Sequence, residues 1–330
     1  MTTRRQSIAA LALTAFAASP RAQQPPVRIY RIGALAVRAR PTPEIPEVFY
    51  DALSRGLKDL GYVQGKNLLI DWRFAEGKFD RLQGLADDLV RTKPELIVTH
   101  STPATEALKK ATSIIPIVAG AVIDPVFSGF AASLGHPGGN ITGLAMLALD
   151  LSPKYLKLLK TIAPRLSRVA VLANSNTSIS SAMVKQIEAA ANILNLTVLP
   201  QSASTVEEID AAFIKAKRER ADAIIVLNDG FFIWRRRQIV DLTVKYRLPS
   251  MFPYAEDTRA GGLMSYGHSL DNTYYRLAIH VDKILKGAKP ADLPFEQPTT
   301  FHHAINLKTA KALGLKIPYE LLLRANEVIE

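Results

Sequence analysis

The chain has 330 residues, of which 48% are hydrophobic and 22% are charged. This length and composition support two compact cores and exclude a largely disordered chain. The formal net charge is +11, but Lys and Arg are spread among Asp and Glu, which argues against a nucleic-acid partner. The densest basic cluster, Arg235, Arg236 and Arg237 beside Trp234, is interpreted as a solvated helix face. The absence of cysteine excludes disulfides, thiolate metal sites, a cysteine nucleophile and a lipoprotein anchor.

The N-terminus has the pattern of a secretory signal peptide. Arg4 and Arg5 precede a short apolar run at residues 7–18, and small residues follow up to Ala22. The run is too short for a membrane-spanning helix, which needs about 20 apolar residues. The pattern predicts a signal peptide over residues 1–22, cleavage after Ala22 and a periplasmic mature protein that is not a lipoprotein.

The chain after this segment alternates between short apolar runs and amphipathic segments. Phe49, Leu53, Leu57 and Leu60 recur at helical spacing, and Gly61 provides a stop signal. A second helix is predicted over residues 79–91. The strands predicted in this half lie at residues 28–37, 67–74, 96–99, 115–118 and 141–144.

The same alternation begins again in the second half of the chain. Helices are predicted around residues 155–162, 179–194, 206–217 and 234–246. Strands are predicted at residues 168–173, 197–199, 223–227, 249–252 and 262–266. Two successive strand–helix series predict an α/β protein with two doubly wound, Rossmann-like lobes. Ligands of such sheets bind beyond the carboxyl ends of the strands, so by analogy a cleft between the lobes is the expected site.

Three blocks of sequence carry a family resemblance. The first holds GYVQGKNL at 61–68 and AEG at 75–77. The second holds IPIV at 115–118, DPV at 124–126 and HPGGNITG at 136–143. The third holds NLKTAKALGLKIP at 306–318 and RANEVIE at 324–330. Together they resemble the substrate-binding family of ABC transporters that includes tryptophan- and tyrosine-binding members, over about residues 27–330.

The resemblance implies a type I periplasmic-binding-protein fold with three hinge crossovers. Lobe 1 would then comprise residues 27–143 plus 265–298, and lobe 2 residues 144–264 plus 299–330. The implied protein is no enzyme. It is a monomeric solute-binding protein of an ABC importer that needs no cofactor. Its expected partners are a small-molecule ligand, such as an aromatic or other amino acid, and a membrane permease.

Two loops depart from the family pattern where a cleft would lie. HSTP at 100–103 replaces a Gly-Thr-Pro type of turn, and NSNT at 174–177 replaces a turn with Asn-Pro. Ser101 and Thr102 precede a helix whose N-terminus suits a ligand carboxylate, although an ordinary helix cap would look the same. Asp124 follows a strand and is a candidate for a ligand amine or hydroxyl, although Asp-Pro is also a common helix start.

Polar and aromatic residues follow the strands of the second half. Amides and a carboxylate there can bind a polar ligand, but turns use the same residue types heavily. Aromatic rings at strand ends can stack on a planar or apolar ligand group, but most aromatic residues are core. The candidates are Asn174, Asn176, Asn228, Asp229, Tyr254 and Tyr266.

Other functions are less consistent with the sequence. His302 and His303 are adjacent, so on a strand they face opposite sides and cannot hold one metal ion together. No nucleophile elbow or catalytic triad is evident, which disfavours an exported hydrolase. The signal-like N-terminus occupies the place of a DNA-binding headpiece, which disfavours an intracellular regulator. A periplasmic ligand sensor that presents its ligand to a membrane signalling receptor remains the alternative to transport.

Overall fold

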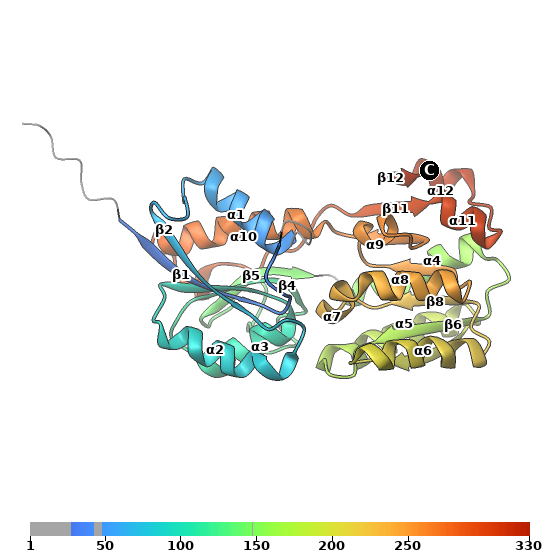
Figure 1. The fold of residues 1–330 in the computed structure, drawn as a ribbon, viewed down its shortest axis with the longest axis horizontal. Coiled ribbons are helices and arrows are strands. Elements are labelled where there is room, and N and C mark those ends of the chain that lie inside the picture. The colour runs from blue at the N-terminus through green and yellow to red at the C-terminus, as the bar shows by residue number, and fades with distance from the viewer. Residues whose placement is uncertain (1–27, 43–47, 147) are drawn as a thin grey trace, which may run out of the picture.

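A computed structural model of the chain describes residues 28–42, 48–146 and 148–330. The predicted signal peptide lies outside the described residues. The chain forms two α/β lobes that lie side by side, each built on its own β-sheet (Figure 1). No helix in the described ranges is long and apolar enough to cross a membrane.

The first lobe contains a five-stranded, fully parallel sheet in the order β2-β1-β3-β4-β5. Its strands are β1 (Tyr30–Ala36), β2 (Leu68–Phe74), β3 (Leu96–His100), β4 (Ile117–Ile123) and β5 (Ile141–Met146). Helices α1 (Val48–Asp59) and α10 (Leu270–Leu285) pack on one face. The short helix η1 (Phe79–Arg81) leads into α2 (Leu82–Arg91), which covers the other face with α3 (Thr102–Ala111).

The second lobe contains a seven-stranded sheet in the order β12-β11-β10-β9-β8-β6-β7, in which only the β10–β11 pair is antiparallel. The strands are β6 (Arg168–Ala173), β7 (Thr197–Ser202), β8 (Ala223–Val226), β9 (Ser250–Phe252), β10 (Met264–Gly267), β11 (His302–Asn306) and β12 (Glu327–Ile329). The longer helices are α4 (Ala148–Ile162), α5 (Ser178–Ile193), α6 (Val206–Arg218) and α8 (Arg236–Lys245). The shorter helices are α7 (Gly230–Trp234), α9 (Ala255–Arg259), α11 (Leu307–Leu313) and α12 (Tyr319–Leu323).

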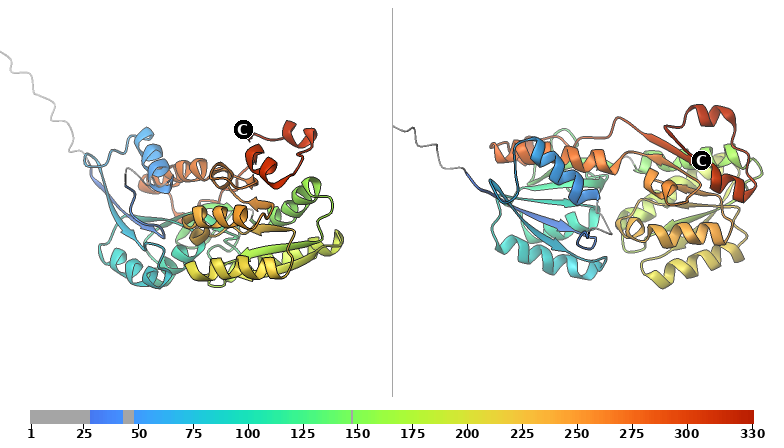
Figure 2. Two further views of the ribbon diagram at one scale, coloured as in Figure 1. Left: turned by 45° about the vertical axis from the view of Figure 1, so that its right-hand side comes forward. Right: turned by 45° about the horizontal axis from the view of Figure 1, so that its top comes forward.

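The chain passes between the two sheets at three places: after β5, after β10 and before β11. Helix α10 therefore returns to the first lobe, where it lies beside α1 in every view (Figure 2). The helix η2 (Pro290–Asp292) and the bridge between Leu144 and Glu296 continue this return. The predicted lobe boundaries differ slightly from the strands: residues 144–146 belong to the first sheet and residues 265–267 to the second.

The central strands are apolar because helices cover both of their faces. Every residue of β3 and β4 is buried, as expected for parallel strands inside a doubly wound sheet. Phe49 and Leu53 of α1 pack with Leu277 of α10 on one side of the first sheet. Leu89 of α2 packs on the other side. This layering brings the carboxyl ends of β3 and β4 to the edge that faces the second lobe.

The predicted helix over residues 234–246 is wrong in its detail. The segment forms two helices, α7 and α8, which meet at Arg235. The interpretation of the basic cluster as a solvated face is also wrong in part. The Arg236 guanidinium forms a 2.6 Å ion pair with the buried carboxylate of Asp257, whereas Arg237 is exposed. Asp229 causes the early helix start, because its side chain caps α7.

Candidate ligand-binding site

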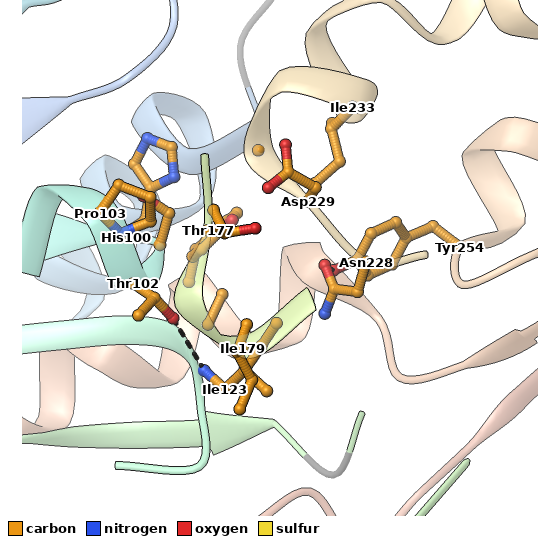
Figure 3. Close-up of a pocket in the computed structure, with 14 residues that line it drawn as sticks. His100, Thr102, Pro103, Ile123, Thr177, Ile179, Asn228, Asp229, Ile233 and Tyr254 are labelled. Carbon is orange, nitrogen blue, oxygen red and sulfur yellow. Dashed lines mark hydrogen bonds between the residues drawn. The ribbon is translucent and has the colours of Figure 1, made fainter. Parts of the chain in front are cut away.

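A cavity lies between the lobes, at the carboxyl ends of the central strands. The empty space between its lining residues is about 390 Å³, a figure that includes open solvent at its mouth. Both lobes contribute to its wall, with His100, Thr102 and Pro103 on one side and Asn228, Asp229 and Tyr254 on the other (Figure 3). The remaining lining residues are Ser101, Ala121, Ile123, Thr177, Ile179, Gly230, Ile233 and Tyr274.

The wall from the first lobe is the N-terminus of α3. Ser101 is 8% exposed, and its backbone adopts φ 76° and ψ 150°, a conformation that is strained for a residue with a Cβ. Its Oγ has no hydrogen-bond partner among the described residues. The Oγ1 of Thr102 accepts a 3.3 Å hydrogen bond from the Ile123 N–H, so the Thr102 hydroxyl can still donate. The wall therefore offers two hydroxyls at the positive end of a helix dipole.

His100 lines the cavity beside this helix. Its ring is buried against Phe49, with ring centroids 4.5 Å apart, and near Tyr274. Burial, together with the positive charge of Arg38, holds the pKa of His100 well below its usual value. The imidazole is therefore neutral at physiological pH, and its Nε2 has no partner among the described residues.

An irregularity in β4 directs further residues into the cavity. The register between β4 and β5 shifts between Ala119 and Val122, and Ala121 has φ 54°. A β-bulge of this kind kinks the strand and re-aims its side chains. Ala121 and Ile123 both line the cavity as a result.

The wall from the second lobe carries the acidic group of the site. The Asp229 carboxylate accepts hydrogen bonds from the Asn174 side-chain amide, at 2.9 Å, and from the Phe231 N–H, at 2.8 Å. Burial raises the pKa of Asp229 to about 6, although both hydrogen bonds act in the opposite direction. Asp229 is therefore ionised near neutral pH, but its charge is poorly solvated.

A polar chain links this wall to the connection between the lobes. The Tyr254 hydroxyl donates a 2.5 Å hydrogen bond to the Asn228 Oδ1. The Asn228 amide lies 3.4 Å from the sulfur of Met146, the last residue of β5. Both lining side chains are buried, so their relative positions are fixed by this bond.

The structure brings five of the predicted site residues together in the cavity wall. These are Ser101, Thr102, Asn228, Asp229 and Tyr254. Asn174 does not line the cavity, but its amide holds Asp229 from behind. Asn176 is exposed, and its N–H donates to the Asn174 Oδ1 in the turn before α5.

Two other predicted residues lie away from this cavity. The Asp124 carboxylate accepts a 3.0 Å hydrogen bond from the Phe127 N–H, so it shapes the turn after β4. Tyr266 lies in β10, where its ring stacks on Phe301 and the Lys154 ammonium lies 3.7 Å from the ring centroid. Both positions follow from local geometry that the sequence pattern did not specify.

Sequence reasoning missed several lining residues. His100 directly precedes the predicted Ser101, and a polar residue at the end of a buried strand is a signal that could have identified it. Tyr274 comes from α10, far along the chain, and only the return of that helix to the first lobe brings it to the site. Ile179 and Ile233 are apolar, so their residue type does not distinguish a lining residue from a core residue.

The described part of the chain offers no metal centre. Within residues 28–42, 48–146 and 148–330, no group of three or more His, Asp or Glu side chains could hold a metal ion. The His302 ring pairs with the Glu327 carboxylate at 3.1 Å, while His303 is buried.

Two α/β lobes, three connections between them and a shared cavity define the class of type I periplasmic binding proteins. The family model of the ABC transporter substrate binding proteins matches residues 47–329. The chain therefore belongs to this family, whose members bind solutes for ABC transporters.

Relatives and solved structures agree with this assignment. A tyrosine-binding protein of Clostridioides difficile (strain R20291) is 28% identical over 263 residues, which are 79% of this chain and 75% of that protein. The ABC domain from Streptococcus pneumoniae in complex with L-Trp is 27% identical, with a TM-score of 0.83 over 91% of this chain and 100% of that one. A conserved domain protein from Vibrio cholerae is 25% identical, with a TM-score of 0.84 over the same shares.

Proposed function

We propose that the protein binds an α-amino acid with an aromatic or large apolar side chain in the interlobe cavity and delivers it to an ABC importer. The observation that carries this proposal is the placement of opposite charges on the two walls. The helix terminus of α3 attracts an anion, and the Asp229 carboxylate attracts a cation. An amino acid presents both charges on one carbon atom.

The ligand carboxylate is assigned to the α3 N-terminus. The hydroxyls of Ser101 and Thr102 can donate to its oxygens, and the helix dipole favours its charge. The ligand ammonium is assigned to Asp229, whose buried carboxylate gains a partner. The two walls are close, since a Cβ built on Gly230 would lie 3.8 Å from the Ser101 Cβ. A zwitterion would therefore stabilise the closed arrangement of the lobes.

The ligand side chain is assigned to the apolar part of the cavity. Ile123, Ile179 and Ile233 contribute aliphatic surface, and the rings of Tyr254 and Tyr274 contribute aromatic surface. Such a lining favours a hydrophobic or aromatic group over a sugar, which needs many polar partners. The tyrosine-binding relative and the L-Trp complex support the same ligand class.

The transport role includes export and a membrane partner. We infer that residues 1–22 direct export, that the mature protein acts outside the cytoplasm as a monomer and that a permease receives its ligand. Support comes from the N-terminal sequence pattern and from the family, whose proteins work with ABC permeases. N-terminal sequencing of the protein from a periplasmic extract tests the cleavage after Ala22, and size-exclusion chromatography tests the monomer.

The binding proposal is tested by isothermal titration calorimetry of the mature protein. L-tryptophan and L-tyrosine are compared with tryptamine, which lacks the carboxylate, and with N-acetyl-L-tryptophan, which lacks the ammonium charge. We expect at least one amino acid to bind and each of the two analogues to bind at least about tenfold more weakly, because each loses a charge-assisted contact. Equal binding of the analogues would contradict the assignment of the two charges.

A further inference from the structure

The two lobes also contact each other outside the cavity, through helix α7. Gly77, in the loop after β2, packs against the indole ring of Trp234: a Cβ built on Gly77 would lie 2.3 Å from the Trp234 Cζ3. Gly77 belongs to the first lobe and Trp234 to the second. Only a residue without a side chain allows this approach, and its φ of 75° also favours glycine.

A second aromatic contact lies beside the first. The rings of Phe79 and Phe231 meet edge to face, with centroids 6.4 Å apart. Phe79 lies in η1 of the first lobe, yet it packs against the apolar core of α2 and α3 and also against that of α6 and α8. The Phe79 ring therefore joins the hydrophobic cores of both lobes.

Helix α7 thus has two functional faces. Asp229, Gly230 and Ile233 line the cavity, whereas Phe231 and Trp234 contact the first lobe away from it. The faces are mechanically coupled, because the carboxylate assigned to the ligand ammonium also accepts the Phe231 N–H and so caps the same helix. The helix is five residues long.

We propose that Gly77, Phe79, Phe231 and Trp234 form an interlobe latch that stabilises the closed state and so sets ligand affinity without touching the ligand. The proposal rests on the proposed function, in which ligand binding requires closure. The latch residues are positioning residues: they hold α7 against the first lobe while Asp229 faces the cavity. Since apparent affinity scales with the population of the competent state, loss of the latch weakens binding.

The side chains suit this role energetically. Trp234 is 36% exposed, and the Arg235 guanidinium lies over its ring, 3.8 Å from the centroid. Opening of the lobes would expose the face that covers Gly77 and the edge of Phe79. The latch therefore adds apolar burial to the closed state that is absent from the open one. Removal of the indole is expected to weaken ligand affinity about tenfold.

The latch is tested by measuring lobe closure directly. The chain has no cysteine, so the pair Asp87→Cys on α2 and Ala211→Cys on α6 allows specific spin labels on the two lobes. Pulsed electron paramagnetic resonance gives the distance distribution for the otherwise wild-type chain and for Trp234→Ala, each without ligand and with L-tryptophan. We expect the short-distance population to fall in Trp234→Ala under both conditions. An unchanged distribution would overturn the proposal.

Two controls separate the latch from other effects. Tyr319→Ala removes an exposed aromatic ring from α12, away from the interface, and should leave the distances unchanged. Gly77→Ala should shift the wild-type chain toward longer distances, because the added Cβ clashes with the Trp234 indole. The same substitution should cause no further shift in Trp234→Ala, where the indole is absent. Equal effects in both backgrounds would show that backbone strain at Gly77, not the indole contact, is responsible, and would overturn the latch.

The readouts also separate this proposal from the proposed function. A chain that fails to bind L-tryptophan or L-tyrosine but still opens in Trp234→Ala supports the latch and contradicts the ligand assignment. If the wild-type chain and Trp234→Ala bind L-tryptophan or L-tyrosine with equal affinity and show equal distances, the result supports the ligand assignment and contradicts the latch.

Discussion

The raised pKa of Asp229 makes a quantitative prediction about ligand binding. The buried carboxylate titrates at about 6 in the ligand-free protein, and only its ionised form can pair with a ligand ammonium. The ionised fraction is nearly complete at pH 8 and about one tenth at pH 5. The apparent dissociation constant for an amino acid should therefore be about tenfold higher at pH 5 than at pH 8. His100 does not contribute to this change, because its pKa is already held well below the usual value.

Asp229→Asn is the matched variant for this prediction. The asparagine oxygen can still accept the hydrogen bonds from Asn174 and from the Phe231 N–H, so helix α7 keeps its cap. We expect affinity at pH 8 to fall by about 1.5–3 kcal/mol, the range for a hydrogen bond to a charged group, and the pH dependence to disappear. Calorimetric titrations of both proteins at pH 5 and pH 8 provide the assay. A wild-type affinity that is equal at the two pH values would refute the reasoning.

Asp229→Asn is expected to weaken ligand binding but to stabilise the ligand-free protein at pH 8. The folded-state pKa of Asp229 lies above the unfolded value of about 3.9, so its contribution to stability is present below that value and is lost as pH rises through 6. Asp229→Asn should therefore raise the unfolding temperature at pH 8 while it weakens binding. Such an exchange of stability for function is common at binding sites.

Three further predictions concern other parts of the chain. Tyr254→Phe leaves the buried Asn228 Oδ1 without its donor and should reduce the free energy of unfolding by about 1–3 kcal/mol in urea titrations; an unchanged value would contradict the assigned bond. At Gly143, φ is 145°, and a Cβ there would lie 1.9 Å from the carbonyl oxygen of Ala119 on the neighbouring strand. Gly143→Ala should therefore lower the unfolding temperature sharply. Gly135 has open space around it, so Gly135→Ala should leave the unfolding temperature nearly unchanged. Burial lowers the pKa of His268 to about 4, so the free energy of unfolding decreases as pH falls below the unfolded-state value of about 6.5. In denaturant titrations, His268→Phe should reduce the loss of stability between pH 7 and pH 5 by about 2 kcal/mol. An identical loss in the wild-type chain and in the variant would contradict this prediction.

Most of the fold was predictable from the sequence because the strands are short, apolar and separated by helical periodicity. The strand over residues 168–173 and the start of α6 were predicted at their observed positions. The split between α7 and α8 was not predictable from periodicity, because a capping side chain at Asp229 starts the first helix earlier. The family of the chain, predicted from three blocks of sequence, is confirmed by the family model.

The cavity was predictable only in part. Residues directly after strands, such as Ser101 and Asp229, could be identified because parallel strands end at one edge of a sheet. Tyr274 could not be, because its role depends on the return of α10 to the first lobe. The contact between Gly77 and Trp234 was also invisible in the sequence, since it depends on how the two lobes meet.

The most direct test of the central claim is a crystal structure of the mature protein with L-tryptophan or L-tyrosine, whichever binds more tightly. The account predicts one molecule in the interlobe cavity, with its carboxylate within hydrogen-bond distance of Ser101 and Thr102. Its ammonium should contact Asp229, and its ring should lie among the isoleucines beside Tyr254. A ligand bound elsewhere, or in the reverse orientation, would contradict the account.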